Sequence, residues 1–193
     1  IRAASPDDAA AIARIYARYV EESAVSFEEV APDAAEIERR MADPPRLPWL
    51  VAEDDGVVVG HVLLSHSWVD ADRRVVEVLV LSPLSVAPDH QGRGTGTALV
   101  AAALAAAEEL GAPTVFLEGD PGFYGSRGFT RAADHGFVRP SDRIPQAAFQ
   151  VAVLPGHEEW MTGRLAYADA FWQLDCVGLR GDVLAAVRAN VGD

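Results

Sequence analysis

Lysine is absent from this chain, because all sixteen residues counted as lysine or arginine are arginine. Without lysine there is no Schiff base and no acetylation of a lysine side chain. The Gly-Lys-Ser/Thr ending of a nucleotide-binding phosphate loop is excluded as well. Cysteine is nearly absent, and the single Cys176 excludes an internal disulfide and a thiolate-rich metal site. We expect Cys176 to be a small buried residue in a protein of a reducing compartment.

Long apolar runs and positive charge are also scarce. The longest strongly apolar run, 98–107, has ten residues, whereas a membrane helix needs about 20. The first residues do not show the basic segment followed by an apolar segment that is typical of a secretory signal. A net charge of −13 would repel the phosphates of a nucleic acid. We therefore expect a cytoplasmic protein with neither a membrane nor a nucleic-acid partner.

Histidines are few and are not spaced as metal ligands. His61 and His66 lie five residues apart on a predicted strand, so their side chains point to opposite faces. The other three, His90, His135 and His157, have no ligand-type neighbours at a suitable spacing. We expect no metal.

Half of the 193 residues are hydrophobic, which is enough to form a packed core. Apolar spacing and turn residues predict strands over 1–4, 49–53, 57–67, 74–86, 114–117, 129–137 and 149–154. They predict helices from Ser5 to about Glu21, over 33–41 and 94–110, at 122–126 and over 182–191. This order predicts an α/β or α+β fold with a mixed sheet and helices on its faces. Pro155-Gly156-His157 predicts a boundary between a compact domain, 1–155, and a C-terminal extension, 156–193, that packs on it.

Two features of the predicted elements have structural consequences. Pro83 interrupts the long apolar strand 74–86 and removes one hydrogen-bond donor, so we expect a bulge or a parting of strands near 82–85. The helix over 94–110 is expected to pack along Leu99, Ala103, Ala106 and Leu110. The second predicted helix follows a loop through Ser26 and Phe27 and ends at Pro44 and Pro45.

The most informative segment joins the end of the long strand to the following helix, over 84–97. Gly92, Gly94 and Gly96 allow the main chain to bend tightly and to approach a ligand closely. The first amides of the helix carry the positive end of its dipole, so the turn favours an anion. Arg93 adds a positive charge, and Thr95 and Thr97 can add hydroxyl donors.

A glycine-rich turn between a strand and a helix serves several nucleotide ligands and sometimes only packs the helix. The glycine spacing here is not that of the dinucleotide-binding fingerprint. The arrangement Gln-x-x-Gly-x-Gly over 91–96 remains. It resembles the pyrophosphate-binding signature of the GNAT superfamily of N-acetyltransferases.

The resemblance implies a fold and a cosubstrate. It implies a mixed, mostly antiparallel central sheet that is splayed after the fourth strand and flanked by helices, and it implies acetyl-CoA. The implied cofactor-binding residues are Leu84, Ser85 and Val86, which pair with the pantetheine arm, and Gln91, Gly92, Arg93, Gly94, Thr95, Gly96 and Thr97, which form the pyrophosphate turn. Residues 83–129 resemble a subgroup of predicted bacterial N-acetyltransferases. Residues 1–60, through stretches such as Tyr16 to Tyr19 and Ser26 to Glu28, resemble the phosphinothricin-type branch.

Acetyl transfer to an amine needs a neutral nucleophile, a polarised carbonyl and a proton for the departing thiolate. Tyr124 lies where the superfamily commonly carries a tyrosine, and we expect it to protonate or stabilise the thiolate; the alternative is a half-buried aromatic bonded to the backbone. A main-chain amide near Val86 would polarise the carbonyl. Glu118 and Glu77 are both candidate bases, with Glu118 preferred, and water is a further alternative.

These residues predict an acetyl-CoA-dependent N-acetyltransferase that acts on a primary amine of a small molecule by direct transfer in a ternary complex. The rival interpretation is a non-catalytic acyl-CoA-binding sensor or interaction module. In that case the aromatic segment 167–172 would form an oligomer contact, with a homodimer as the simplest assembly. A turn that only packs the helix is the third interpretation.

Overall fold

The computed structural model describes residues 1–22, 28, 30–43 and 47–191. The chain divides into two compact units. Unit 1 comprises 1–64 and 81–106, and unit 2 comprises 65–80 and 107–193. The predicted loop through Ser26 and Phe27 and the predicted helix end at Pro44 and Pro45 lie outside the described residues.

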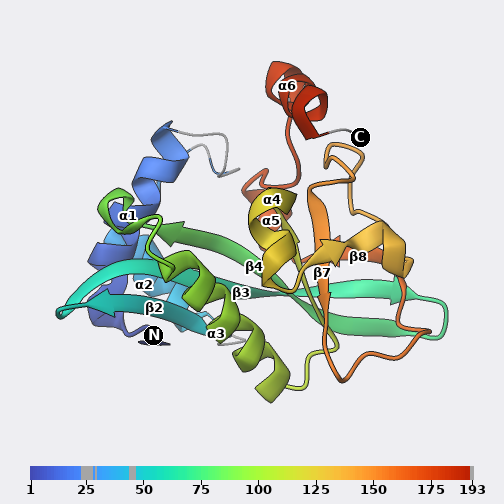
Figure 1. Ribbon diagram of the computed structural model, residues 1–193, viewed down its shortest axis with the longest axis horizontal. Helices are drawn as coiled ribbons and strands as arrows, with labels where there is room; N and C mark the ends of the chain where they lie inside the picture. Colours follow the sequence, from blue (N-terminus) through green and yellow to red (C-terminus); the bar gives the residue numbers. More distant parts are fainter. Residues whose placement is uncertain (23–27, 29, 44–46, 192–193) are drawn as a thin grey trace. The chain divides into compact units, whose positions relative to one another are not determined.

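Two helices and a hairpin form most of unit 1. β1 (Arg2–Ala3) pairs with β2 (Trp49–Asp54), and β2 pairs with the first part of β3 (Val57–Ala71), both antiparallel. A short 3-10 turn (Pro6–Asp8) leads into α1 (Ala9–Glu22), which packs beside α2 (Ala34–Ala42) (Figure 1). Ile12, Ile37 and Val51, each at most 1% exposed, lie in the core of this unit.

The start of α1 is held by a charged cluster around Asp8. The Arg2 guanidinium donates to both carboxylate oxygens of Asp8, at 2.7 and 2.8 Å, and the Ser5 amide donates to the same group at 2.8 Å. The hydrogen bonds from Arg2 lower the pKa of Asp8 to about 2 against the opposing effect of burial. The Ser-Pro-Asp-Asp start predicted this helix because it supplies a capping residue, a first-turn proline and acids.

Unit 2 contains the rest of the sheet. β4 (Val75–Val86) runs parallel to β5 (Thr114–Glu118), with Leu79 opposite Val115. β7 (Phe149–Val153) is antiparallel to β5 on one side and to the two-residue β6 (Thr130–Arg131) on the other. Hydrogen bonding orders the strands β1-β2-β3-β4-β5-β7-β6. The sheet is therefore mixed and mostly antiparallel, with flanking helices, as predicted.

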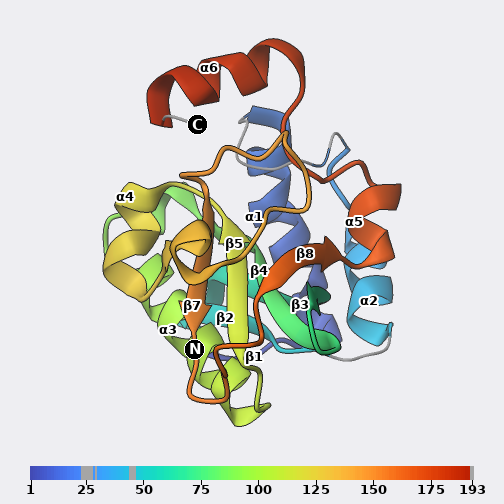
Figure 2. The same cartoon turned by 90° about the vertical axis from the view of Figure 1, so that its right-hand side faces the viewer.

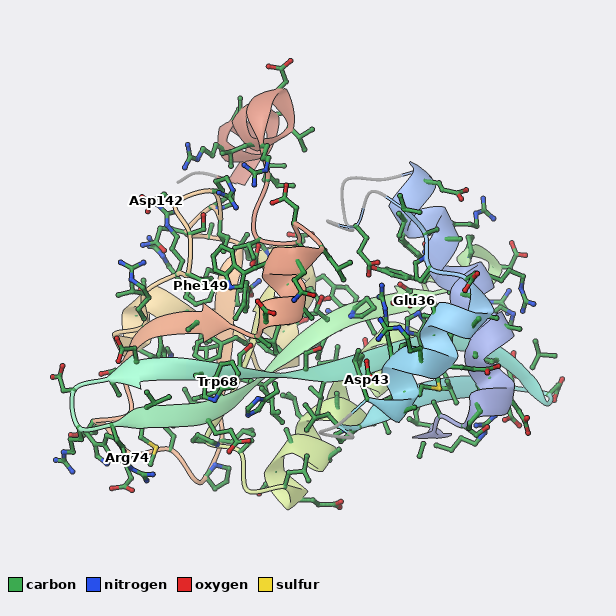
Figure 3. The ribbon with its side chains drawn as sticks, turned by 180° about the vertical axis from the view of Figure 1, so that it is seen from behind. Glu36, Asp43, Trp68, Arg74, Asp142 and Phe149 are labelled. Carbon is green, nitrogen blue, oxygen red and sulfur yellow. The ribbon has the colours of Figure 1, made fainter. Side chains whose placement is uncertain are left out.

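Aromatic side chains fill the core of unit 2. The Phe116 and Phe149 rings stack with centroids 5.6 Å apart, and Phe137 meets Phe116 edge-on at 4.8 Å. Figure 3 labels Phe149 at the start of β7, together with Trp68 on β3. The three phenylalanine rings and the adjoining Val151 and Leu165 are at most 2% exposed, so they exclude water from the strands that carry the site residues of this unit.

The C-terminal region adds a strand and two helices to unit 2. β8 (Gly163–Tyr167) pairs antiparallel with the second part of β3, and α5 (Asp169–Gln173) follows it directly (Figure 2). Met161, Leu165 and Val177 belong to the same apolar cluster as Phe116. The chain continues into α6 (Gly181–Val191).

Two local expectations differ from the structure, and a third is confirmed. The predicted strand over 129–137 is only β6 followed by a 3-10 turn (Ala132–His135), because Phe129, Ala132 and Phe137 are spaced to bury one side of a turn. The helix α3 (Thr95–Glu109) ends before Leu110, which is 57% exposed. Ala107 occupies the core position that was expected for Leu110. β4 itself is continuous to Val86 across a cis peptide between Ser82 and Pro83. Its register with β5 ends at Val80, opposite Phe116, so these two strands part near 82–85, as expected.

Gly60 sets how closely the end of β4 packs in unit 1. A Cβ atom at Gly60 would lie 3.0 Å from the Ser85 carbonyl oxygen, 3.1 Å from Leu99 and 3.3 Å from Val86. All three neighbours are buried, so none can move away without disturbing the packing.

We expect Gly60→Ala to lower the free energy of unfolding by about 1–3 kcal/mol, the usual cost of overpacking a core. Urea denaturation measures the effect. Gly125→Ala is the matched control, because φ is −59° there and no atom lies within 4 Å of the added methyl group. Equal stability of the two variants would contradict the close packing of Gly60 against Ser85.

Candidate active site

The turn between β4 and α3 has the backbone geometry of an anion site. β4 ends at Val86, and a 3-10 turn (Pro88–His90) leads to Gln91 and the glycines. Gly92 and Gly94 have φ of +68° and +87°, and no atom lies within 4 Å of the position a Cβ would take at either residue. Left-handed φ favours glycine because a side chain strains the backbone there. The exposed turn can thus present its main chain to a ligand.

The N-terminus of α3 supplies the charge of this site. Ala98 donates to the Gly94 carbonyl at 2.9 Å, which is the first hydrogen bond of the helical ladder. Amides that precede such a bond point out of the helix and carry the positive end of its dipole. Arg93 is exposed in the turn and adds a full positive charge. These groups fit a diphosphate such as that of CoA.

One predicted donor of the turn is used internally. The Thr95 hydroxyl donates to the His90 carbonyl oxygen at 3.3 Å, which ties the helix start to the preceding 3-10 turn. The Thr95 side chain therefore stabilises the turn, and the main chain of Thr95 is the part that is suited to binding an anion.

A tyrosine of α1 connects the turn to the end of β4. The Tyr19 hydroxyl donates to the Val86 carbonyl oxygen. The side-chain amide of Gln91 donates through Nε2 to the Tyr19 hydroxyl at 2.5 Å and to the Val86 carbonyl oxygen at 3.3 Å. Ala87, the next residue, donates to the Val59 carbonyl at 2.8 Å. Gln91 and Tyr19 therefore fix where the turn leaves the strand.

The sequence around Tyr19 does not indicate this hydrogen bond. Its partner Val86 lies 67 residues away. A contact of that separation has no local pattern in a single sequence.

Tyr124 lies in unit 2, at the end of the short helix α4 (Pro121–Tyr124). Its ring meets Phe123 edge-on at 4.8 Å and Phe129 at 5.8 Å. Gly119 makes room for it, since a Cβ there would lie 2.4 Å from the Tyr124 ring. The alternative of a hydroxyl bonded to the backbone is not observed, because no hydrogen bond of this hydroxyl is found within the described ranges. Burial raises the pKa of Tyr124 to about 12, so the phenol is protonated at neutral pH.

Glu118 lies in unit 2 at the end of β5. Burial raises the pKa of its carboxyl to about 7, although a hydrogen bond from Tyr167 and the charge of Arg143 act in the opposite direction. The Tyr167 hydroxyl donates to Glu118 Oε1 at 2.5 Å. The next peptide is fixed on both sides, because Gly119 donates to the Ala148 carbonyl and Gln150 donates to the Gly119 carbonyl, each at 3.0 Å.

The alternative base candidate has a different environment. The Glu77 side chain is 75% exposed on β4 and lies 2.6 Å from His66 Nε2. An exposed carboxylate beside a histidine is an ordinary surface pair. Glu118 therefore fits the role of a base better than Glu77.

The remaining candidate residues do not form a metal centre. No group of three His, Cys, Asp or Glu side chains suited to a metal ion is found among the residues with a described placement. His61 is fully buried beside Trp49, and burial lowers its pKa to about 3. Cys176 is partly exposed rather than buried as expected. Within the described part of the chain, no helix is long and apolar enough to span a bilayer.

Comparison with known proteins agrees with this geometry. The model of the Acetyltransferase (GNAT) family matches residues 12–137. The N-acetyltransferase YjhQ of Escherichia coli strain K12 is 30% identical over 156 residues, which cover 79% of this chain and 85% of YjhQ. Phosphinothricin N-acetyltransferase of Alcaligenes faecalis is 36% identical over 110 residues, 56% of this chain and 54% of that protein. This second match thus spans about half of the relative's length.

Solved structures give the same result. The Escherichia coli GNAT family N-acetyltransferase YhbS, crystallised in complex with CoA, matches with a TM-score of 0.69 and 27% identity, over 92% of this chain and 94% of that one. A GNAT family acetyltransferase from Brucella melitensis, in complex with acetyl-CoA, matches with a TM-score of 0.62 and 27% identity, over 88% and 96% of the two chains.

We expect Gly94→Ala to raise the dissociation constant of CoA about 5- to 30-fold, because a side chain at this φ costs about 1–2 kcal/mol and favours another path of the turn. Isothermal titration calorimetry measures the constant. Gly125→Ala serves again as the control and should bind CoA normally. An unchanged constant in Gly94→Ala would show that the left-handed turn is not needed for CoA.

Proposed function

This chain belongs to the GNAT family of acetyltransferases, and we propose that it transfers the acetyl group of acetyl-CoA directly to a primary amine of a small molecule in a ternary complex. The observation that carries the proposal is the turn at Gly92 and Gly94, with its open main chain at the positive end of α3. CoA or acetyl-CoA is present in structures of relatives with the same fold. Acetyl-CoA is the cosubstrate.

The proposed roles in CoA binding follow the main chain of unit 1. Gln91 to Thr97 receive the diphosphate, with Arg93 as the formal cation. Leu84, Ser85 and Val86 offer backbone groups to the pantetheine arm, as an exposed strand edge pairs with an extended ligand. Tyr19 and Gln91 hold the Val86 carbonyl oxygen, and a main-chain amide near Val86 is the proposed donor to the thioester carbonyl.

The proposed reaction is an addition followed by an elimination. The neutral amine nitrogen bonds to the acetyl carbon, and the carbonyl electron pair moves onto oxygen. The pair returns, the carbon–sulfur bond breaks and its electrons leave with sulfur. The thiolate gains one proton, and the new amide nitrogen loses one, so amine and acetyl-CoA give the acetylated amine and CoA. An amine that arrives as a cation must first lose a further proton to a base.

Tyr124 is the proposed proton donor to the thiolate. A thiol has an ordinary pKa near 8.5, whereas burial raises the pKa of Tyr124 to about 12. The phenol is therefore protonated before transfer. Because it is a weaker acid than the thiol, it stabilises the departing thiolate by a donated hydrogen bond and passes its proton on only as it takes up the proton of the amide nitrogen.

Glu118 is the proposed base that removes the proton of the amine cation. A carboxyl with a pKa of about 7 accepts a proton far more readily near neutral pH than one with a usual pKa near 4.3. The net charge of −13 favours the approach of a cationic acceptor. Phosphinothricin N-acetyltransferase, by its name, acts on a small molecule, which supports the same acceptor class. The cytoplasmic location, the homodimer and the boundary at 155 stay predictions.

Incubation with acetyl-CoA and a panel of amino acids, polyamines, aminoglycosides and a peptide with a free N-terminus tests the proposed acceptor. We expect thiol release with a small amine, and double-reciprocal plots that intersect, because both substrates bind before transfer. Parallel lines would oppose direct transfer. Turnover restricted to the peptide would contradict a small-molecule acceptor.

Tyr124→Phe should lower kcat about 100-fold, the usual contribution of a general acid, and should leave the dissociation constant of acetyl-CoA within about twofold, because the ring contacts are kept. Steady-state kinetics and calorimetry separate the two effects. A normal kcat would remove Tyr124 from the mechanism, and a loss of binding alone would make it a packing residue.

A further inference from the structure

Two groups act on the Glu118 carboxyl, and one of them, Tyr167, belongs to the C-terminal region. Tyr167, the last residue of β8, donates its hydroxyl to Glu118 Oε1 at 2.5 Å. The charge of Arg143, in the segment before β7, lowers the pKa of this carboxyl. No hydrogen bond to Glu118 Oε2 is found within the described ranges. One carboxylate oxygen is therefore held, and the other remains for a substrate.

Tyr167 is itself firmly held. Its ring stacks on Phe171 of α5 with centroids 4.7 Å apart, and the Trp172 indole donates to the Tyr167 carbonyl at 3.3 Å. Pairing with Ser67 of β3 fixes the backbone of Tyr167, and the side chain is 5% exposed. A hydroxyl on so restricted a ring constrains the orientation of its partner.

Arg143 is held by the segment after α5. Its Nε and Nη2 donate to the Val177 carbonyl at 3.2 and 2.8 Å, and Leu179 donates to the Arg143 carbonyl at 3.1 Å. Gly178, with φ of +68°, allows this approach, because a Cβ there would lie 2.8 Å from the Arg143 backbone. The guanidinium is thus positioned by residues 177–179 rather than by Glu118.

We propose that Tyr167 is a positioning residue for acetyl transfer: its hydroxyl holds the Glu118 carboxylate so that Oε2 faces the proton of the acceptor amine. The base is then assembled from two regions, with Glu118 on β5 and its orienting group on the C-terminal β8. The inference rests on the proposed role of Glu118 in the acetyltransferase reaction. It gives the C-terminal strand a part in the chemistry beyond its packing.

The protonation of Glu118 should report this contact. The titratable or charged groups that act on Glu118 are Tyr167 on β8 and Arg143 before β7. Burial raises the pKa of Tyr167 well above its usual value, so its hydroxyl donates at neutral pH. A hydrogen bond donated to a carboxylate favours the charged form. Its removal therefore raises the pKa of Glu118 further.

The experiment is a carboxyl-carbon NMR titration of the full chain labelled at glutamate, with the Glu118 signal assigned from Glu118→Gln. We expect a midpoint near pH 7 in the wild type and about one pH unit higher in Tyr167→Phe. The substitution keeps the ring on Phe171 and so preserves the fold. Tyr16→Phe is the matched control, because it removes a hydroxyl that donates to a different glutamate, Glu28, at 3.0 Å.

The pH profile of kcat/KM, measured with the best amine of the panel, gives the second readout. Glu118 must be deprotonated to act as a base, so activity rises with pH through its pKa, and this acidic limb should move upward with the NMR midpoint. At pH 7 we expect about fivefold lower kcat/KM in Tyr167→Phe, with recovery of most of the loss at pH 9.

The outcomes separate this inference from the proposed function. Equal loss at every pH, or a wild-type acidic limb despite a raised Glu118 midpoint, overturns the positioning role while acetyl transfer stands. An unshifted midpoint overturns the hydrogen-bonded contact itself. No turnover of any amine by the wild type overturns the proposed function, and with it the role of Glu118, whatever the titration gives.

Discussion

The anion site depends on how the main chain passes from β4 into α3. The strand ends at Val86 and the helix begins at Thr95, so eight residues must reverse the chain and still leave amides free to face outward. Gly92 and Gly94 permit this because their φ values are positive. Gln91 and Tyr19 hold the point of departure through the Val86 carbonyl. The anion site is therefore a property of backbone geometry, and the side chains around it mainly keep that geometry in place.

The chemistry relies on a different physical effect, the burial of ionisable groups. Removal from water disfavours charge, which raises the pKa of Tyr124 to about 12 and that of Glu118 to about 7. A phenol with a raised pKa stays protonated and can donate a hydrogen bond to a departing thiolate. A carboxyl so affected becomes a usable base near neutral pH. The aromatic core around Phe116 and the C-terminal strand produce this environment in unit 2.

Much of this could be predicted from the sequence because the decisive signals are local. Glycine spacing over 91–96 identified the turn, and apolar periodicity located most helices and strands. The strand expected over 129–137 was wrong because Phe129 and Phe137 satisfy the apolar pattern of a strand and also of a folded turn. The contacts of Tyr19 with Val86 and of Tyr167 with Glu118 span 67 and 49 residues. Only the fold brings such partners together, so no local pattern indicated them.

An amide NMR titration of the nitrogen-labelled chain with CoA, repeated with inorganic pyrophosphate, tests directly whether the turn binds the diphosphate. If the turn binds the diphosphate, the amide signals of Gly92, Gly94 and Gly96 should shift most in both titrations, and pyrophosphate should compete with CoA. Binding of CoA that leaves these three signals unchanged would contradict the account.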